Sequence, residues 1–142
     1  MTIAPCSFSS LTDEQLLARV QTLAREERHA TAALIAALGE LDERRLYLGQ
    51  GYSSLFAYCT QALHLSEDAA YNRIRAARVA EKWPVVLDMI ADGSVSVTAV
   101  RLLSDALTDT NHLELLGAAR HKSKREVEEL IAAVRPQRAQ RV

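Results

Sequence analysis

The fold is decided by residues 52–90, which read YSSLFAYCTQALHLSEDAAYNRIRAARVAEKWPVVLDMI. The pattern predicts a helix, a three-residue turn (HLS), a second and basic helix, and a third helix after the Trp-Pro pair. Ser53 or Ser54 can cap the first helix and Ser66 the second, because a serine oxygen accepts hydrogen bonds from the free N–H groups of an opening turn. This order is the outline of a helix-turn-helix, whose second helix lies in the major groove of DNA.

The apolar residues of these two helices predict how they pack. On the first helix they recur at steps of three and four: Leu55, Phe56, Cys59 and Leu63. On the second helix the predicted packing face consists of Ala70, Tyr71, Ile74 and Ala77. Because small thiols are common in protein cores, we expect Cys59 to be a core residue rather than a reactive one.

The other face of the second helix carries side chains that suit DNA. They follow one another by three, three and four positions: Asn72, Arg75, Arg78 and Lys82. Arginine suits guanine edges and phosphates, asparagine suits adenine edges, and lysine binds phosphates as a point charge. Arg73, beside this stripe, is included among the predicted DNA contacts. A solvated helix face gives the same pattern, because helices commonly carry arginine and lysine outward.

Composition and charge allow nucleic-acid binding only through local patches. A chain of 142 residues with 49% hydrophobic and 25% charged residues fits one globular domain. The net charge of −1 argues against a protein that coats DNA uniformly, but residues 83–119 carry a net −4 and residues 120–142 a net +4. We therefore expect Lys122, Lys124 and Arg125 to act as a phosphate clamp.

The sequence gives no sign of a membrane segment or of a cofactor. The start, MTIAPCSFSS, lacks the basic region and apolar core of a signal peptide, and no apolar run approaches bilayer length. We therefore expect a cytoplasmic protein without membrane contact. Cys6 and Cys59 lie far apart and have no metal-ligand spacing, so no metal or other cofactor is predicted.

Residues 12–47 predict either one helix of about ten turns or two helices broken near Gly39. The capping box Thr12-x-x-Gln15 opens this region, and apolar residues then keep a three-or-four rhythm. A helix of that length projects beyond a small core unless something covers it. The expected cover is a homodimer through residues 12–47, and a folded-back pair of helices is the alternative. Residues 1–11 are expected to be a flexible lead.

The remaining residues predict further helices and no strand. Ser96 and the capping box Ser123-x-x-Glu126 open two of them, and Pro136 is expected to close the last. The predicted fold is all-α: a long N-terminal helix, or a broken pair, followed by a compact multi-helix domain that contains the helix-turn-helix. Residues 12–134 form a single helical domain in this prediction, with the bundle over 52–134 and a basic, disordered tail over 135–142.

Several motifs, in this order, carry a resemblance to a known family. They are Gly51 with Ser53-Ser54, Leu65-Ser66, the Arg-Ala-Ala-Arg run at 75–78, Trp83-Pro84, and DGSVS at 92–96. Together they resemble the helical N-terminal domain, of unknown function, of bacterial HNH endonuclease-like proteins, over roughly residues 12–134. Residues 65–133 are more loosely similar to the helix-turn-helix domain of ParB- and KorB-type partition proteins. The resemblance implies that residues 67–82 form the recognition helix, with Asn72, Arg75 and Arg78 as its readers.

The chain departs from that family because it lacks a nuclease motif. An HNH site needs clustered histidine and asparagine residues that hold a divalent metal and activate water. The four histidines of this chain are scattered: His29, His64, His112 and His121. No nucleophile-histidine spacing and no phosphate-cradling glycine loop are present. We therefore expect no catalytic residue and no metal ligand, in either a stand-alone relative or a fragment of a longer protein.

The sequence thus favours a non-catalytic, dimeric helix-turn-helix protein that binds double-stranded DNA. The alternative is a helical protein–protein interaction or oligomerisation module whose basic faces only keep it in solution. An enzyme is a third possibility, which no constellation of residues in the sequence supports.

Overall fold

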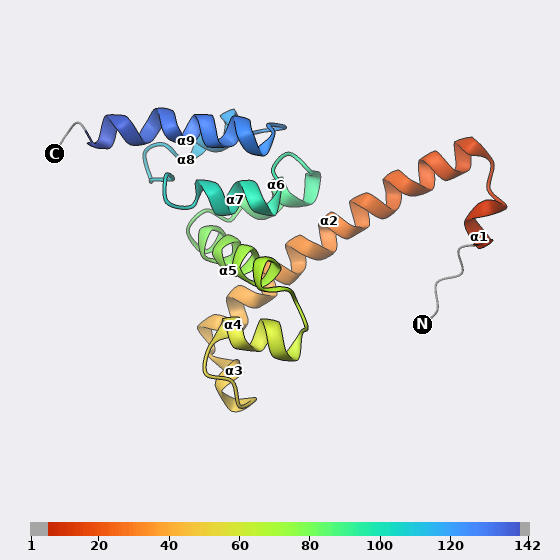
Figure 1. Ribbon diagram of the computed structural model, residues 1–142, viewed down its shortest axis with the longest axis horizontal. Helices are drawn as coiled ribbons and strands as arrows, with labels where there is room; N and C mark the ends of the chain where they lie inside the picture. Colours follow the sequence, from red (N-terminus) through yellow and green to blue (C-terminus); the bar gives the residue numbers. More distant parts are fainter. Residues whose placement is uncertain (1–5, 140–142) are drawn as a thin grey trace.

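The described part of the chain folds into helices joined by turns (Figure 1). The computed structural model describes the backbone of residues 6–139 and the side chains of residues 8–134, and no strand occurs within that range. The helices are α1 (Cys6–Ser9), α2 (Asp13–Glu43), α3 (Leu46–Gly49), α4 (Leu55–Ala57), the π-helix η1 (Tyr58–Ala62), α5 (Glu67–Lys82), α6 (Val85–Asp92), α7 (Val97–Leu103), α8 (His112–Ala118) and α9 (Lys124–Ala139). The predicted all-α class is confirmed.

α2 is one continuous helix, so the first of the two predicted alternatives is correct and the folded-back pair is not formed. The Thr12 hydroxyl accepts the N–H of Gln15 at 3.1 Å, and Gln15 Oε1 accepts the N–H of Thr12 at 3.0 Å, which completes the predicted capping box. Gly39 lies inside the helix and does not break it. The helix ends at Glu43, shortly before Arg45 takes a left-handed conformation with φ 52°.

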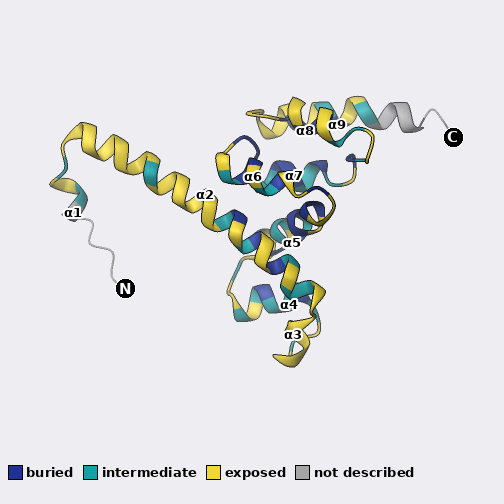
Figure 2. Ribbon diagram, turned by 180° about the vertical axis from the view of Figure 1, so that it is seen from behind, coloured by how far each residue is buried: buried dark blue, intermediate teal, exposed yellow. Residues whose placement is uncertain are grey.

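The two halves of α2 lie in different surroundings. Ala32, Ile35 and Leu38 are buried, and this half packs against α5 and α6. In the first half Leu17 is 67% exposed and Val20 is 55% exposed. Figure 2 shows that half as a mostly yellow, exposed rod that extends away from the bundle. The second half therefore contributes buried residues to the core of its own chain, whereas the large apolar side chains of the first half are exposed.

α5 is the central helix of the bundle and contacts α2, α4, α6 and α7. Its buried residues are Ala70, Ile74, Ala76, Ala77, Val79 and Ala80. Four of these are alanines, whose short side chains let neighbouring helices approach from several directions. Two apolar clusters result. The smaller joins α5 to α2, α4 and η1, and the larger joins it to α2, α6, α7, α8 and α9.

Residues 55–82 form a helical segment, a turn and a second helix in the predicted order. Ser54 caps α4 by accepting the Ala57 N–H at 3.0 Å, and Ser66 caps α5 by accepting the Ala69 N–H at 3.1 Å. α4 continues into the π-helix η1, and the turn that follows holds His64 at φ 59°. The first helix is therefore shorter and more irregular than the spacing of its apolar residues predicts.

Three residues that were predicted to pack are instead exposed: Phe56, Leu63 and Tyr71. The wider turn of η1 shifts Leu63 away from the buried face of Leu55 and Cys59, because a π-helix does not keep the 3.6-residue period. Tyr71 lies beside Ala70, which takes the buried position on α5. Cys59 is buried as predicted, and this burial raises the pKa of its thiol.

Two of the later helices, α7 and α9, begin where the sequence predicts. Ser96 caps α7 by accepting the Ala99 N–H at 3.0 Å. Ser123 and Glu126 form the second capping box, with N···O distances of 2.9 and 3.2 Å. Gly93, at φ 84°, ends α6 in the left-handed conformation. All these features depend on residues at most four positions apart, which is why local sequence suffices to find them.

Both termini differ from the predicted boundaries. α1 lies within the predicted flexible lead, of which residues 1–5 fall outside the described range. α9 continues through Pro136 to Ala139, so the helix end predicted before Pro136 and the disordered tail predicted from residue 135 are wrong as far as residue 139. Inside a helix, proline removes one intrahelical hydrogen bond and clashes with the preceding turn, so the local sequence does not explain why α9 continues. Residues 140–142 lie outside the described range.

Asp92 joins two loops at one end of the bundle. Its carboxylate accepts hydrogen bonds from the backbone N–H and the hydroxyl of Ser94, and the Ser94 carbonyl accepts the His121 N–H at 2.7 Å. The side-chain hydrogen bond from Ser94 lowers the pKa of Asp92 most, followed by the backbone hydrogen bond from the same residue. Arg120 and His121 lower it further by charge. The α6–α7 loop is thus tied to the α8–α9 turn.

We expect acid to weaken this connection. The pKa of Asp92 is lower in the folded chain than the usual value near 3.9, so its contribution to stability is complete above about pH 4 and is lost as the pH falls through the folded pKa. The free energy of unfolding, measured by urea titration, should decrease more between pH 5 and pH 3 in the wild type than in an Asp92→Asn variant. Equal decreases would contradict this assignment.

Candidate nucleic-acid interface

One stripe of α5 reaches the surface between α3–α4 on one side and α7–α9 on the other. It consists of Tyr71, Arg75, Arg78 and Lys82, which line three adjoining hollows. The same face also includes Arg101 of α7. We call these five residues the α5 face. Much of the rest of α5 is covered by α2, α4, α6 and α7.

Arg75 is a structural residue as well as a surface residue. Its Nη2 donates to Ser104 Oγ at 2.8 Å and to Asp105 Oδ1 at 2.9 Å, and its side chain is 29% exposed. Its Nε is buried and has no hydrogen-bond partner among the described residues. The sequence predicts that Arg75 contacts bases, but in the structure its side chain joins α5 to the end of α7. Part of its hydrogen-bonding capacity is therefore already taken.

Arg78 and Lys82 are more accessible. The Arg78 side chain is 59% exposed, and its Nη2 lies 4.0 Å from Asp42 Oδ2, which is at the limit of an ion pair. Lys82 Nζ lies 5.8 Å from the centre of the Trp83 ring, and His112 stacks on the same ring with centroids 5.4 Å apart. Both cations can leave these weak contacts for a stronger anionic ligand, because loose surface pairs contribute at most about 1 kcal/mol.

Two predicted DNA contacts lie off the α5 face. Asn72 and Arg73 are both half-buried on the flanks of the helix. Arg73 lines a separate hollow beside Arg28 and Gly93, and its Nη1 donates to the Ala69 carbonyl at 3.3 Å. On an α-helix, position 73 points nearly opposite to position 75, whereas position 72 lies at the edge of the stripe beside Arg75, so one face does not hold all the predicted residues.

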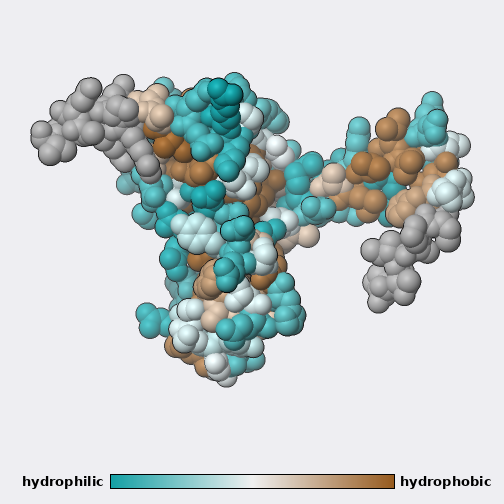
Figure 3. All heavy atoms as spheres, viewed as in Figure 1, coloured by the Kyte–Doolittle hydropathy of each residue, from teal (hydrophilic) through white to brown (hydrophobic). Residues whose placement is uncertain are grey.

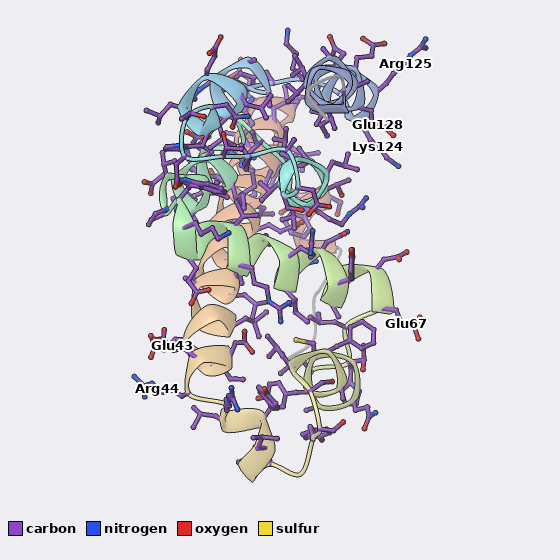
Figure 4. The ribbon with its side chains drawn as sticks, turned by 90° about the vertical axis from the view of Figure 1, so that its left-hand side faces the viewer. Glu43, Arg44, Glu67, Lys124, Arg125 and Glu128 are labelled. Carbon is purple, nitrogen blue, oxygen red and sulfur yellow. The ribbon has the colours of Figure 1, made fainter. Side chains whose placement is uncertain are left out.

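The C-terminal basic residues divide between two directions. Lys122, Lys124 and Arg125 are all exposed. Figure 4 shows that Lys124 and Glu128 project from the same side of α9, whereas Arg125 points away from the bundle. Glu128 lines the hollow that contains Arg75 and Arg101, and Lys124 lies one helical turn before Glu128 on α9. Arg125 instead forms an ion pair within α9, with its Nε 3.5 Å from Glu129 Oε1.

Sequence reasoning missed two members of the α5 face. Arg101 lies in segment 83–119, whose net charge is −4, so the charge of the segment as a whole gives no sign of this one arginine. The available signal was a single cation within the otherwise uncharged helix VTAVRLL. Tyr71 was assigned to the packing face but is 49% exposed, and it lines two of the hollows.

The charge of this surface is mixed. Carboxylates alternate with the cations around the hollows: Asp42, Glu81, Asp105 and Glu128. Arg75 is paired with one of them, whereas Arg78 and Lys82 make only weak contacts. The four cations of the α5 face and these four carboxylates carry no net formal charge, so an attraction for anions would depend on accessible single cations such as Arg78 and Lys82.

Comparisons with known proteins add no relative to these observations. No family model, no curated protein and no solved structure matches the chain. Within residues 6–139 no helix combines the length and the apolar character that a membrane crossing requires. The described residues also include no group of three or more histidine, cysteine, aspartate or glutamate side chains that could hold a metal ion. The absence of catalytic activity stays a prediction.

Proposed function

We propose that the protein binds double-stranded DNA without cleaving it, and that the α5 face makes the contact. The observation that carries this proposal is the line of cations from Lys82 and Arg78, through Arg75, to Arg101 on α7. Lysine and arginine that bind phosphates release the counterions around DNA, which drives association. The resemblance to the helical domain of HNH endonuclease-like proteins agrees with a DNA partner and stays a prediction, as does a cytoplasmic location.

The burial of α5 favours contact with the phosphate backbone over deep insertion into the major groove. A recognition helix reads base edges by projecting from its domain. α5 is flanked by other helices and offers one stripe, in which Arg75 is already bound to Asp105. Arg78 and Lys82 would therefore bind phosphates of one strand, with Lys122 and Lys124 as a second point of contact. Such contacts position a protein on DNA but carry little sequence information.

The proposal includes a homodimer through the exposed half of α2. Two copies would offer two α5 faces to one duplex and double the number of phosphate contacts. The buried half of α2 is excluded from this interface, because Ile35 and Leu38 are already covered by the chain's own helices.

The test is a fluorescence anisotropy titration of a labelled duplex at several salt concentrations. We expect the wild type to bind at low salt, and binding to weaken as salt rises. In the variant Arg78→Glu with Lys82→Glu, the affinity for the duplex should fall by roughly tenfold or more. The slope of log K against log salt should become shallower by about two, because two phosphate contacts are lost. Arg75 is left unchanged, because its replacement would also disturb the contact with Asp105.

A matched control carries Arg25→Glu with Arg44→Glu, which changes the net charge equally at two exposed positions that line none of the three hollows of the α5 face. This control should lose much less affinity than the first variant. If wild type fails to bind at low salt, the DNA proposal is wrong. If both variants lose the same affinity, binding depends on net charge and the α5 face is not the site.

The alternative function is a helical module for protein partners. The mixed charge around the hollows favours it, because interleaved carboxylates such as Asp105 and Glu128 repel a phosphate backbone. A protein surface of complementary mixed charge would fit the same face. Absence of DNA binding at low salt, together with a folded wild type, would favour this function over the first.

A further inference from the structure

The first half of α2 carries a row of apolar side chains that the described part of the chain leaves exposed. We call residues 13–27 the arm. Its large apolar side chains are all exposed: Leu16, Leu17, Val20 and Leu23. Figure 3 shows hydrophobic residues gathered along the arm, well separated from those of the bundle. Single exposed leucines are ordinary on protein surfaces, but a continuous exposed row of them marks an interaction site.

The arm gains little stability from its own residues when no other helix packs along it. An isolated helix of about fifteen residues is only marginally stable in water, even with good helix-forming residues. Near its base, the Arg28 Nε donates to the Ala91 carbonyl at 3.4 Å, and closer to the N-terminus the capping box of Thr12 is the main local support. A second helix along the apolar row would supply the burial that the arm lacks.

The spacing of the row identifies the kind of partner. Leu16, Val20 and Leu23 follow one another by four and three positions, which is the seam of a coiled coil. Glu27 occupies the next seam position and Ala30 the one after it. The seam is thus short, and it ends where the helix enters the bundle.

We propose that the arm pairs with the arm of a second copy, in antiparallel orientation, so that Val20 of each copy packs against Leu23 of the other. This register sets Arg19 of each copy near Glu26 of the other, where their charges attract. It also sets Leu17 of each copy over the small side chain of Ala24. Because the pair is symmetric, each contact occurs twice.

The parallel orientation is disfavoured by the same residues. In a parallel pair each seam residue meets its own copy, so Glu27 would face Glu27 at the interface, and two like charges would be brought together. Arg19 would then lie near Ala24, where it gains no opposite charge. In the antiparallel pair Glu27 of each copy faces Leu16 of the other instead of a like charge, and Arg19 and Glu26 gain opposite charges in this orientation.

This inference rests on the proposed homodimer but does not depend on DNA binding, and its test contains no DNA. Sedimentation equilibrium over a wide range of protein concentrations should show a reversible dimer for the wild type. Val20→Asp should be a monomer with an unchanged helical circular dichroism spectrum, because Val20 is exposed in its own chain.

Charge exchange tests the orientation. Arg19→Glu and Glu26→Arg, each alone, should raise the dimer dissociation constant by roughly tenfold, since each replaces two attractions by two repulsions. The double variant Arg19→Glu with Glu26→Arg should restore wild-type association. A monomeric wild type at all concentrations would overturn the inference, and so would a dimer that resists Val20→Asp. A double variant no tighter than the single ones would overturn the antiparallel register.

Discussion

Replacing Leu103 by alanine is expected to lower the free energy of unfolding by about 3 to 4 kcal/mol. Leu103 ends α7, is 0% exposed, and belongs to the larger apolar cluster. The substitution removes buried methyl groups and leaves a cavity that the surrounding helices fill only in part, and both effects favour the unfolded chain. Because a domain of this size is stable by only about 5 to 15 kcal/mol, such a loss should be easily measured.

The matched control is Leu113→Ala on α8, where the leucine is 72% exposed. The same chemical change should cost less than about 0.5 kcal/mol there, because little apolar area is returned to water. Urea titrations of both variants, followed by circular dichroism at 222 nm, provide the comparison. Similar costs at the two positions would show that α7 does not pack as described.

Replacing Gly93 by alanine is expected to destabilise the fold by about 2 kcal/mol. Gly93 ends α6 with φ 84°, a conformation that costs a residue with a Cβ about 1–2 kcal/mol. An added Cβ would also lie 3.0 Å from Arg28 Nε, so the arginine side chain would have to move. That movement would disturb the hydrogen bond from Arg28 Nε to the Ala91 carbonyl.

The same substitution at Gly39 should have the opposite sign. Gly39 lies in the interior of α2 with a helical backbone, and an added Cβ would meet the Ala77 Cβ at 3.9 Å, an ordinary contact. Glycine in a helix is less stable than alanine by about 0.5–1 kcal/mol, so Gly39→Ala should raise the free energy of unfolding by up to that amount. Thermal unfolding of both glycine variants gives the comparison, and a destabilised Gly39→Ala would mean that α2 and α5 lie closer than described.

Local sequence predicted the beginnings of the helices well. The caps at Thr12, Ser54, Ser66, Ser96 and Ser123 are all formed. Each of them is a hydrogen bond between groups three residues apart, and so the information is contained in a few neighbouring residues. The left-handed Gly93 was predictable for the same reason.

The faces of the helices were predicted less well. α5 carries alanines around much of its circumference, so the apolar pattern does not single out one buried side, and Tyr71 was placed on the wrong one. The partner of Arg75 is Asp105, thirty positions away, on an element whose placement depends on the packing of α7. Neither fact follows from the residues near position 75.

The sequence by itself thus determined an all-α chain, the starts of its helices and the presence of a basic stripe, because these depend on hydrogen bonds and spacing within one or two turns. Only the tertiary structure decided that α5 is enclosed, that Arg75 is bound to α7, and that Arg101 joins the same face. It also decided that the row of apolar residues along α2 is buried at Leu38 and exposed at Leu16 and Val20. The rhythm is the same in both halves, and what differs is whether α5 and α6 lie beside it, which depends on contacts between residues far apart in the chain.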